Sequence, residues 1–136
     1  MAAILYEAGV TTLPEARGKM AGEKENALRK LAGFYRPHVN GAGTAELLDT
    51  AVAAFRKARE QVRNKLSHAH PHTAGKDVEG NYLPGLGYTV RDGSSWETLS
   101  RTPGDLLDLA VEIEMSISTL SDARRAVRDL PVSKLV

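Results

Sequence analysis

The sequence contains no cysteine, few aromatic residues and almost no net charge. Without cysteine, disulfide scaffolds, thiolate zinc sites and cysteine nucleophiles are excluded. The 18 basic and 17 acidic residues give a formal net charge of +1, so the chain has no general excess of positive charge that would favour nucleic acid or membrane. Any basic surface must therefore be local. A length of 136 residues suits one domain with a core of its own.

Long hydrophobic runs are also missing. The most apolar segment, residues 106–120, contains Asp108, Glu112 and Glu114 and is typical of a helix with one buried face. No stretch approaches the roughly 18 uncharged apolar residues of a membrane span. The first ten residues lack the positive charge that precedes the apolar part of a signal peptide. We therefore expect a cytoplasmic protein without membrane contact.

Apolar residues recur at helical spacing over residues 14–34, 44–67 and 102–130. The middle segment is the clearest, because Thr44 is a good N-cap and its eight apolar positions fall within an arc of about 140°. The residues expected on the buried faces are Met20, Ala27, Leu28, Leu31, Phe34, Leu47, Leu48, Ala51, Val52, Phe55, Ala58, Val62, Leu66, Leu106, Leu109, Ala110, Ile113, Ile117, Leu120 and Val127. The pattern predicts an all-α fold, a small helical bundle with three long helices in a single domain over residues 1–136.

A glycine-rich stretch interrupts the helical period at residues 72–101. We expect an irregular insert between the last two long helices, with one short β-hairpin in which residues 88–91 and 95–99 pair across Asp92-Gly93. Three helices do not close a bundle. A short helix within the first ten residues, or a second copy of the chain, is expected to cover the open face, and we predict a homodimer.

Three of the four histidines lie within residues 68–72, where the middle helix is expected to end. Arg63-Asn64 followed by His68 resembles the motif of the HEPN family, in which an arginine and a polar residue, commonly asparagine, precede a histidine after a short spacer. The resemblance implies a helical bundle that dimerises and sets two motifs together as a metal-independent endoribonuclease. Many members of this family are toxins or defence effectors. RNA, and an antitoxin or regulatory protein, are the partners that it implies.

The resemblance implies catalytic roles for Arg63 and His68 and a supporting role for Asn64, while the longer spacing makes His70 an alternative to His68. These residue types suit the chemistry. Histidine can take the proton from the 2′-hydroxyl, and arginine can stabilise the charge that develops on the phosphate, so the products would carry 2′,3′-cyclic phosphates. No cofactor is needed.

Helical geometry places a condition on this site. In an unbroken α-helix His68 is rotated about 140° from Arg63, whereas His70 returns to within about 20°. Either the chain swings His68 back after the helix ends, or the site is composed across a dimer.

Arginines 56, 59 and 63 recur at helical spacing and, with Lys65, are candidates for binding the RNA backbone. A solvated helix flank relieved by Glu60 is the competing interpretation. Metal binding by the histidines and Asp77 is disfavoured, because the sequence offers no second half-site with ligand spacing. Two further interpretations stay open. One is a catalytically inactive HEPN-like module that binds RNA or a protein through the glycine-rich insert, and the other is an unrelated helical protein.

Overall fold

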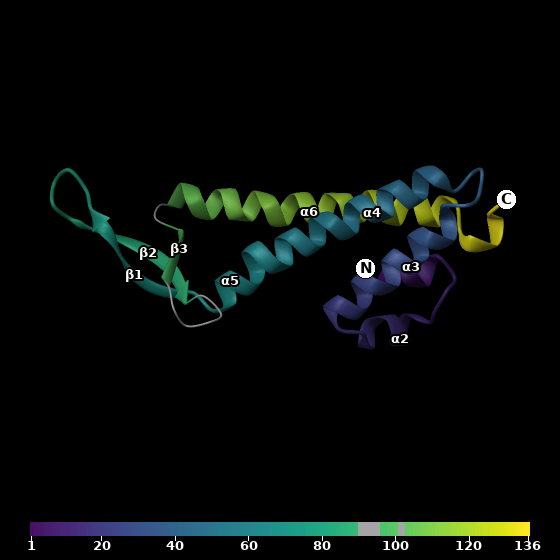
Figure 1. The fold of residues 1–136 in the computed structure, drawn as a ribbon, viewed down its shortest axis with the longest axis horizontal. Coiled ribbons are helices and arrows are strands. Elements are labelled where there is room, and N and C mark those ends of the chain that lie inside the picture. The colour runs from purple at the N-terminus through teal and green to yellow at the C-terminus, as the bar shows by residue number, and fades with distance from the viewer. Residues whose placement is uncertain (90–95, 101–102) are drawn as a thin grey trace. The chain divides into compact units, whose positions relative to one another are not determined.

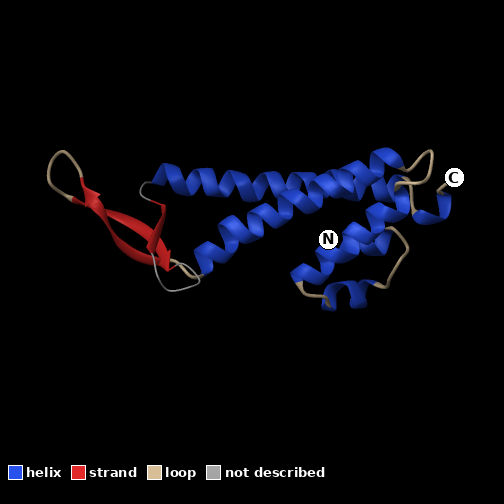
Figure 2. Ribbon diagram, in the orientation of Figure 1, coloured by secondary structure: helices blue, strands red, loops and turns tan. Residues whose placement is uncertain are grey.

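The structure is a computed structural model that describes residues 1–89, 96–100 and 103–136 (Figure 1). It divides into two compact units, of which unit 1 comprises residues 1–56 and 115–136 and unit 2 comprises residues 57–114. Helices dominate the described residues, as predicted, and the strands all belong to unit 2 (Figure 2). The expectation of a single domain stays a prediction.

Helices supply the secondary structure of unit 1. In chain order the helices that lie wholly or partly in it are α1 (Ala2–Glu7), α2 (Leu13–Gly18), α3 (Ala21–Tyr35), α4 (Ala42–Lys57), α6 (Pro103–Asp129) and the 3-10 helix η2 (Val132–Lys134). The short helix expected within the first ten residues is confirmed as α1. The expected start of the last long helix is also confirmed, since α6 begins at Pro103.

The first long helix of the prediction is in fact two helices. After Gly18 the backbone of Lys19 is extended, with φ −69° and ψ 142°, and a new helix begins at Ala21. The Met20 N–H donates to the Glu23 carboxylate at 2.6 Å and so caps the start of α3. Glycine weakens a helix, and the local cap at Glu23 favours the break.

The middle helix begins two residues earlier than predicted. Thr44 is not an N-cap but lies buried inside α4, which starts at Ala42. The turn before it depends on Gly41, where a Cβ atom would lie 2.2 Å from the Tyr35 carbonyl oxygen. Because that neighbour is backbone, only glycine fits this close approach between the end of α3 and the start of α4.

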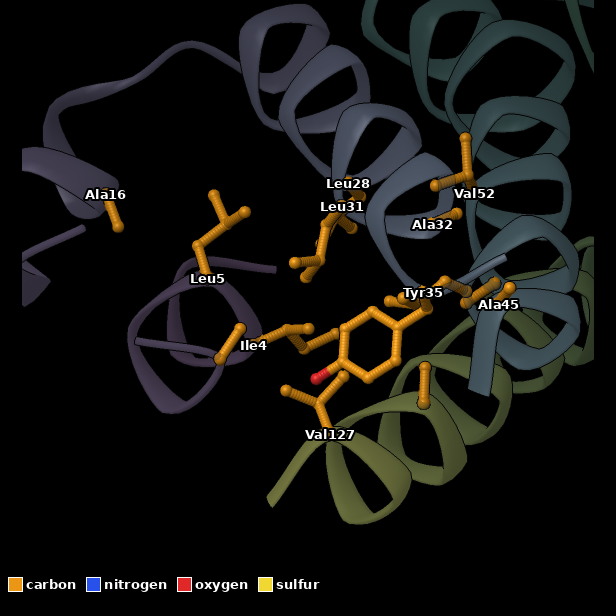
Figure 3. Close-up of a cluster of buried hydrophobic side chains, with 14 residues drawn as sticks. Ile4, Leu5, Ala16, Leu28, Leu31, Ala32, Tyr35, Ala45, Val52 and Val127 are labelled. Atoms are coloured by element: carbon orange, nitrogen blue, oxygen red, sulfur yellow. The ribbon is translucent and has the colours of Figure 1, made fainter. Parts of the chain in front are cut away.

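The core of unit 1 surrounds Tyr35, whose ring is fully buried (Figure 3). The Tyr35 hydroxyl donates to the Leu130 carbonyl. Side chains from α1, α3, α4 and α6 pack around it, and α2 adds Ala16. The buried cluster consists of Ile4, Leu5, Ala8, Ala16, Leu28, Leu31, Ala32, Tyr35, Ala45, Leu48, Ala51, Val52, Ala123 and Val127. Its residues on α3 and α4 include several of those expected to be buried.

Some of the apolar residues expected in the core are exposed instead. Met20 and Phe34 are 78% and 59% exposed, and Ile117 is 59% exposed. Leu47 and Leu106 are also exposed. Helical spacing places a residue on a face of its helix, but burial requires a neighbouring element on that face, which the sequence pattern does not supply.

In unit 2 the helical run continues beyond Lys57 and ends at Ser67, as predicted. It does so through a π-helical turn, η1 (Ala58–Arg63), followed by the short helix α5 (Asn64–Ser67). The Asn64 N–H donates to the Arg59 carbonyl five residues back, which defines the wider turn. Ala58 and Val62 are both buried on this turn.

The stretch expected to be irregular is an antiparallel three-stranded sheet with the order β1-β2-β3. Its strands are β1 (His70–Lys76), β2 (Tyr82–Thr89) and β3 (Trp96–Ser100). The predicted hairpin corresponds to β2 and β3, although its turn lies outside the described residues. Proline and glycine are rare in strands, so Pro71, Pro84 and Gly85 gave no strand signal for β1 and the first part of β2. Pro71 lies on β1, which is an outer strand of the sheet.

Candidate functional site

The residues of the predicted motif span three elements of unit 2. Arg63 ends the π-helical turn, Asn64 begins α5, His68 caps that helix and His70 opens β1. His70 precedes Pro71 and has the extended backbone of a strand, because proline disfavours a helical conformation at the residue before it. The motif therefore occupies the junction between a helix and a sheet.

Arg63 and His68 leave the helical end on different sides. The backbone from Arg63 (φ −59°, ψ −49°) to Asn64 (φ −65°, ψ −39°) is α-helical, and α5 continues to Ser67. The His68 N–H still donates to the Lys65 carbonyl at 3.2 Å, so the chain does not swing back before His68. Five α-helical steps rotate the two side chains about 140° apart. Within one chain the side chains of these two residues therefore leave the helix in different directions.

The argument that would return His70 to the side of Arg63 does not apply, because the helix ends at Ser67. His70 instead pairs with Gly87 in the β1–β2 ladder. The cause is Pro71, because a proline disfavours a helical conformation at the residue before it, which is His70.

The side chains of the motif are accessible to a large ligand. Arg63, Asn64, His68 and His70 are all exposed, and Lys65 is half-buried. The Ser67 hydroxyl donates to the Asn64 carbonyl at 2.9 Å and holds the last turn of α5 together. The junction therefore presents a cation, an amide and two imidazoles to solvent.

The arginines expected to track an RNA backbone have acidic neighbours. In unit 1 the Arg56 Nε atom lies 4.0 Å from an oxygen of Glu25, whose side chain is only 4% exposed. In unit 2 an Arg59 guanidinium nitrogen lies 3.2 Å from the Glu60 carboxylate. Sequence reasoning identified Glu60 as a neighbour and missed Glu25. The available signal was that Glu25 precedes the buried Leu28 by one helical turn, on the apolar face of its helix.

The Asp77 carboxylate holds the β1–β2 turn. It accepts the backbone N–H groups of Glu79 and Asn81, both at 2.9 Å. The hydrogen bond from the Asn81 backbone is the main cause of its lowered pKa, with smaller contributions from the Asn81 side chain and the Glu79 and Gly80 N–H groups. Among the residues that the structure describes, no three histidine or acidic side chains gather closely enough to hold a metal ion.

None of the described helices combines the length and the apolar character that crossing a lipid bilayer requires. No protein-family model, no curated protein and no solved structure matches this chain.

Proposed function

We propose that residues 63–70 bind RNA and that the chain is a metal-independent endoribonuclease of the HEPN type, working in the cytoplasm as a toxin or defence effector. The observation that carries this proposal is the joint exposure of Arg63, Asn64, His68 and His70 at the end of a helical run. An antitoxin or regulatory protein is the protein partner in this proposal. The HEPN-like character of the helical fold belongs to the proposal as well.

Each exposed side chain has a defined role. The His68 imidazole takes the proton from the 2′-hydroxyl that attacks the neighbouring phosphorus. The Arg63 guanidinium donates two hydrogen bonds to the phosphate oxygens as negative charge develops on them. Asn64 donates to a phosphate oxygen, and His70 is the alternative base. The bond between the phosphorus and the 5′-oxygen breaks, the 5′-oxygen takes a proton from water, and a 2′,3′-cyclic phosphate remains.

Two copies of the chain are required for this chemistry. Because Arg63 and His68 diverge by about 140° within one chain, the proposal places the two groups that act on one phosphate in different copies. In a two-fold symmetric dimer, Arg63 of one copy can face His68 of the other, and symmetry repeats the pair at a second site. The proposal therefore includes a homodimer with composite sites.

A second candidate is a catalytically inactive module that binds RNA or a protein partner. The divergence of Arg63 and His68 within the chain favours it, since binding does not require the two side chains to meet. The sheet that starts at His70 supplies a contact surface directly after the motif, and there the Lys76 ammonium lies 4.7 Å from the centre of the Tyr82 ring. A lysine next to an exposed tyrosine suits a phosphate and a stacked base.

The deciding experiment incubates the purified protein with a mixed RNA pool in excess EDTA. Arg63→Ala and His68→Ala are each expected to lower cleavage by about 100-fold or more, because each removes one group from the reacting phosphate. Arg125→Ala is the matched control, since this exposed arginine lies on α6 outside the motif. Ends are identified as cyclic phosphates by mass spectrometry. Cleavage by both variants at the wild-type rate would contradict the catalytic roles.

Mixing the two inactive variants tests the composite site. If Arg63 and His68 act across a dimer, random exchange gives heterodimers with one intact site, and about one quarter of the wild-type activity returns. A site within one chain would give no recovery. A wild-type protein that does not cleave RNA but retains it in a filter-binding assay, with weaker retention for Arg63→Ala, would instead establish the inactive module.

A further inference from the structure

Unit 1 contains a hollow of about 280 Å³ that plays no part in the proposed RNA site. It lies among α1, the segment that follows it, the end of α2 and the outer face of α3. The residues that line it are Leu5, Val10, Thr11, Lys19, Ala27, Lys30, Leu31 and Phe34.

The floor and the rim of this hollow are apolar. Leu5 and Leu31 belong to the buried cluster of unit 1 and are 1% and 2% exposed (Figure 3). Val10 and Phe34 are 47% and 59% exposed, although both are large apolar side chains. Exposed apolar side chains next to an open hollow would lose water contact if an apolar group entered it, which favours binding of such a group.

The charges of the lining are positive. Lys19 is half-buried and Lys30 is exposed. The acid close to Lys19 is Glu15, whose pKa is lowered chiefly by hydrogen bonds from Thr11 and Thr12 and least by the charge of Lys19. The Glu15 carboxylate accepts the Thr11 hydroxyl at 2.8 Å and the Thr12 N–H at 3.2 Å. The two lysines and the Glu15 carboxylate, which already accepts hydrogen bonds, together give this region an excess of positive charge.

From the apolar floor and the two lysines of the lining we infer that this hollow binds a small amphipathic anion, an aliphatic carboxylate. Its chain lies against Leu5, Leu31 and Phe34, and its carboxylate lies between the ammonium groups of Lys19 and Lys30. The volume is just below the range of sites for drug-sized ligands, about 300–1,000 Å³, and so suits one chain of medium length. A helical peptide would need anchor sites spread over several turns.

The first test titrates decanoate, below its micelle concentration, into the ¹⁵N-labelled full chain. We expect amide shifts at Thr11, Lys19 and Lys30 and a Kd below about 1 mM. Decyl maltoside has the same chain with a neutral head group, and we expect it to bind more weakly. Replacing Lys19 or Lys30 with alanine should weaken decanoate binding about fivefold for each lysine and leave decyl maltoside unaffected. Arg29→Ala, an exposed cation on the same helix outside the lining, is the control.

A second pair of variants tests the apolar part. Ala27→Leu fills the hollow and should abolish binding of both detergents, whereas Phe34→Ala removes an exposed wall and should weaken both without unfolding the chain. Absence of shifts in the lining at saturating decanoate would overturn the inference. Equal binding of decanoate by the wild type and the lysine double variant would overturn it as well, and saturable binding of an acidic peptide alone would assign the hollow to a protein partner.

Discussion

The interactions that stabilise unit 1 internally differ from those that stabilise unit 2. Unit 1 has a contiguous buried cluster of fourteen apolar residues, Tyr35 among them. Among the described side chains of unit 2, the buried apolar ones are Ala58 and Val62, and its strands are joined mainly by backbone hydrogen bonds. The exposed motif lies in the unit with less apolar burial. The residues expected to stabilise the fold and those of the proposed chemistry therefore lie in different parts of the sequence. Substitutions can change stability and the proposed activity separately.

The largest effect is expected from truncating the core of unit 1. Leu28 is fully buried, and Leu28→Ala should lower the free energy of unfolding by about 2–5 kcal/mol through lost burial and the cavity left behind. Leu107→Ala, at a position in unit 2 that is 67% exposed, should change it by less than about 0.5 kcal/mol. Urea unfolding measures both. A comparable loss in the two variants would contradict the contrast between the units.

An intermediate effect is expected from the ion pair between α1 and α6 in unit 1. The Arg124 guanidinium donates to both oxygens of Glu7, at 2.7–3.1 Å, and the Glu7 side chain is only 17% exposed. Arg124→Ala leaves that carboxylate without its cation and should lower the free energy of unfolding at neutral pH, by less than Leu28→Ala does. Arg125→Ala, which has an exposed guanidinium on the same helix, is the control and should cost little.

This pair also predicts a pH dependence. The hydrogen bond from Arg124 is the largest cause of the lowered pKa of Glu7. A lowered folded pKa contributes stability that is complete above the ordinary value of 4.5 and is lost as pH falls through the folded pKa. The stability difference between the wild type and Arg124→Ala should therefore shrink as pH falls below 4.5. Urea unfolding at several pH values measures it, and a difference that grew with acidity would contradict the pairing.

The smallest and most local effect is expected at the β1–β2 turn of unit 2. Protonation of Asp77 removes its negative charge and weakens the hydrogen bonds from the Glu79 and Asn81 amides, so the shifts of these amides should titrate with a midpoint below the ordinary 3.8. The charge-assisted hydrogen bonds are present above that pH and weaken as pH falls through the lowered pKa. Asp77→Ala should abolish this titration, while Glu79→Ala should retain it at Asn81. A midpoint above 3.8 would contradict the hydrogen-bonded turn.

Features with a local cause could be predicted from the sequence. The end of the helical run at Ser67 follows from Pro71, and the start of α6 follows from Pro103. Features caused by contacts between distant residues were missed. Gly41 is needed because of the Tyr35 carbonyl, and β1 forms because β2 pairs with it. Neither requirement leaves a periodic pattern in the sequence.

The features of the candidate site also differ in whether they have a local cause. The position of Arg63, Asn64 and His68 at a helix end was predicted from local signals and is confirmed, whereas their action on RNA stays a prediction. The position of Glu25 on the apolar face of its helix had a local signal, but its pairing with Arg56 had none, because the pair joins two helices. The return of His70 to the side of Arg63 was stated only for an unbroken helix, and the strand that begins at His70 excludes that case.

The π-helical turn has a consequence for comparing sequences. Its hydrogen bonds span five residues where an α-helix spans four, so η1 holds one residue that an α-helix would not need. A related sequence one residue shorter between Lys57 and Asn64 would keep the elements on both sides and close the turn to an α-helix. An alignment should place its gap there. The motif residues of the two sequences would then match when positions are counted back from the end of the helical run. They would differ by one residue when positions are counted from the start of α4.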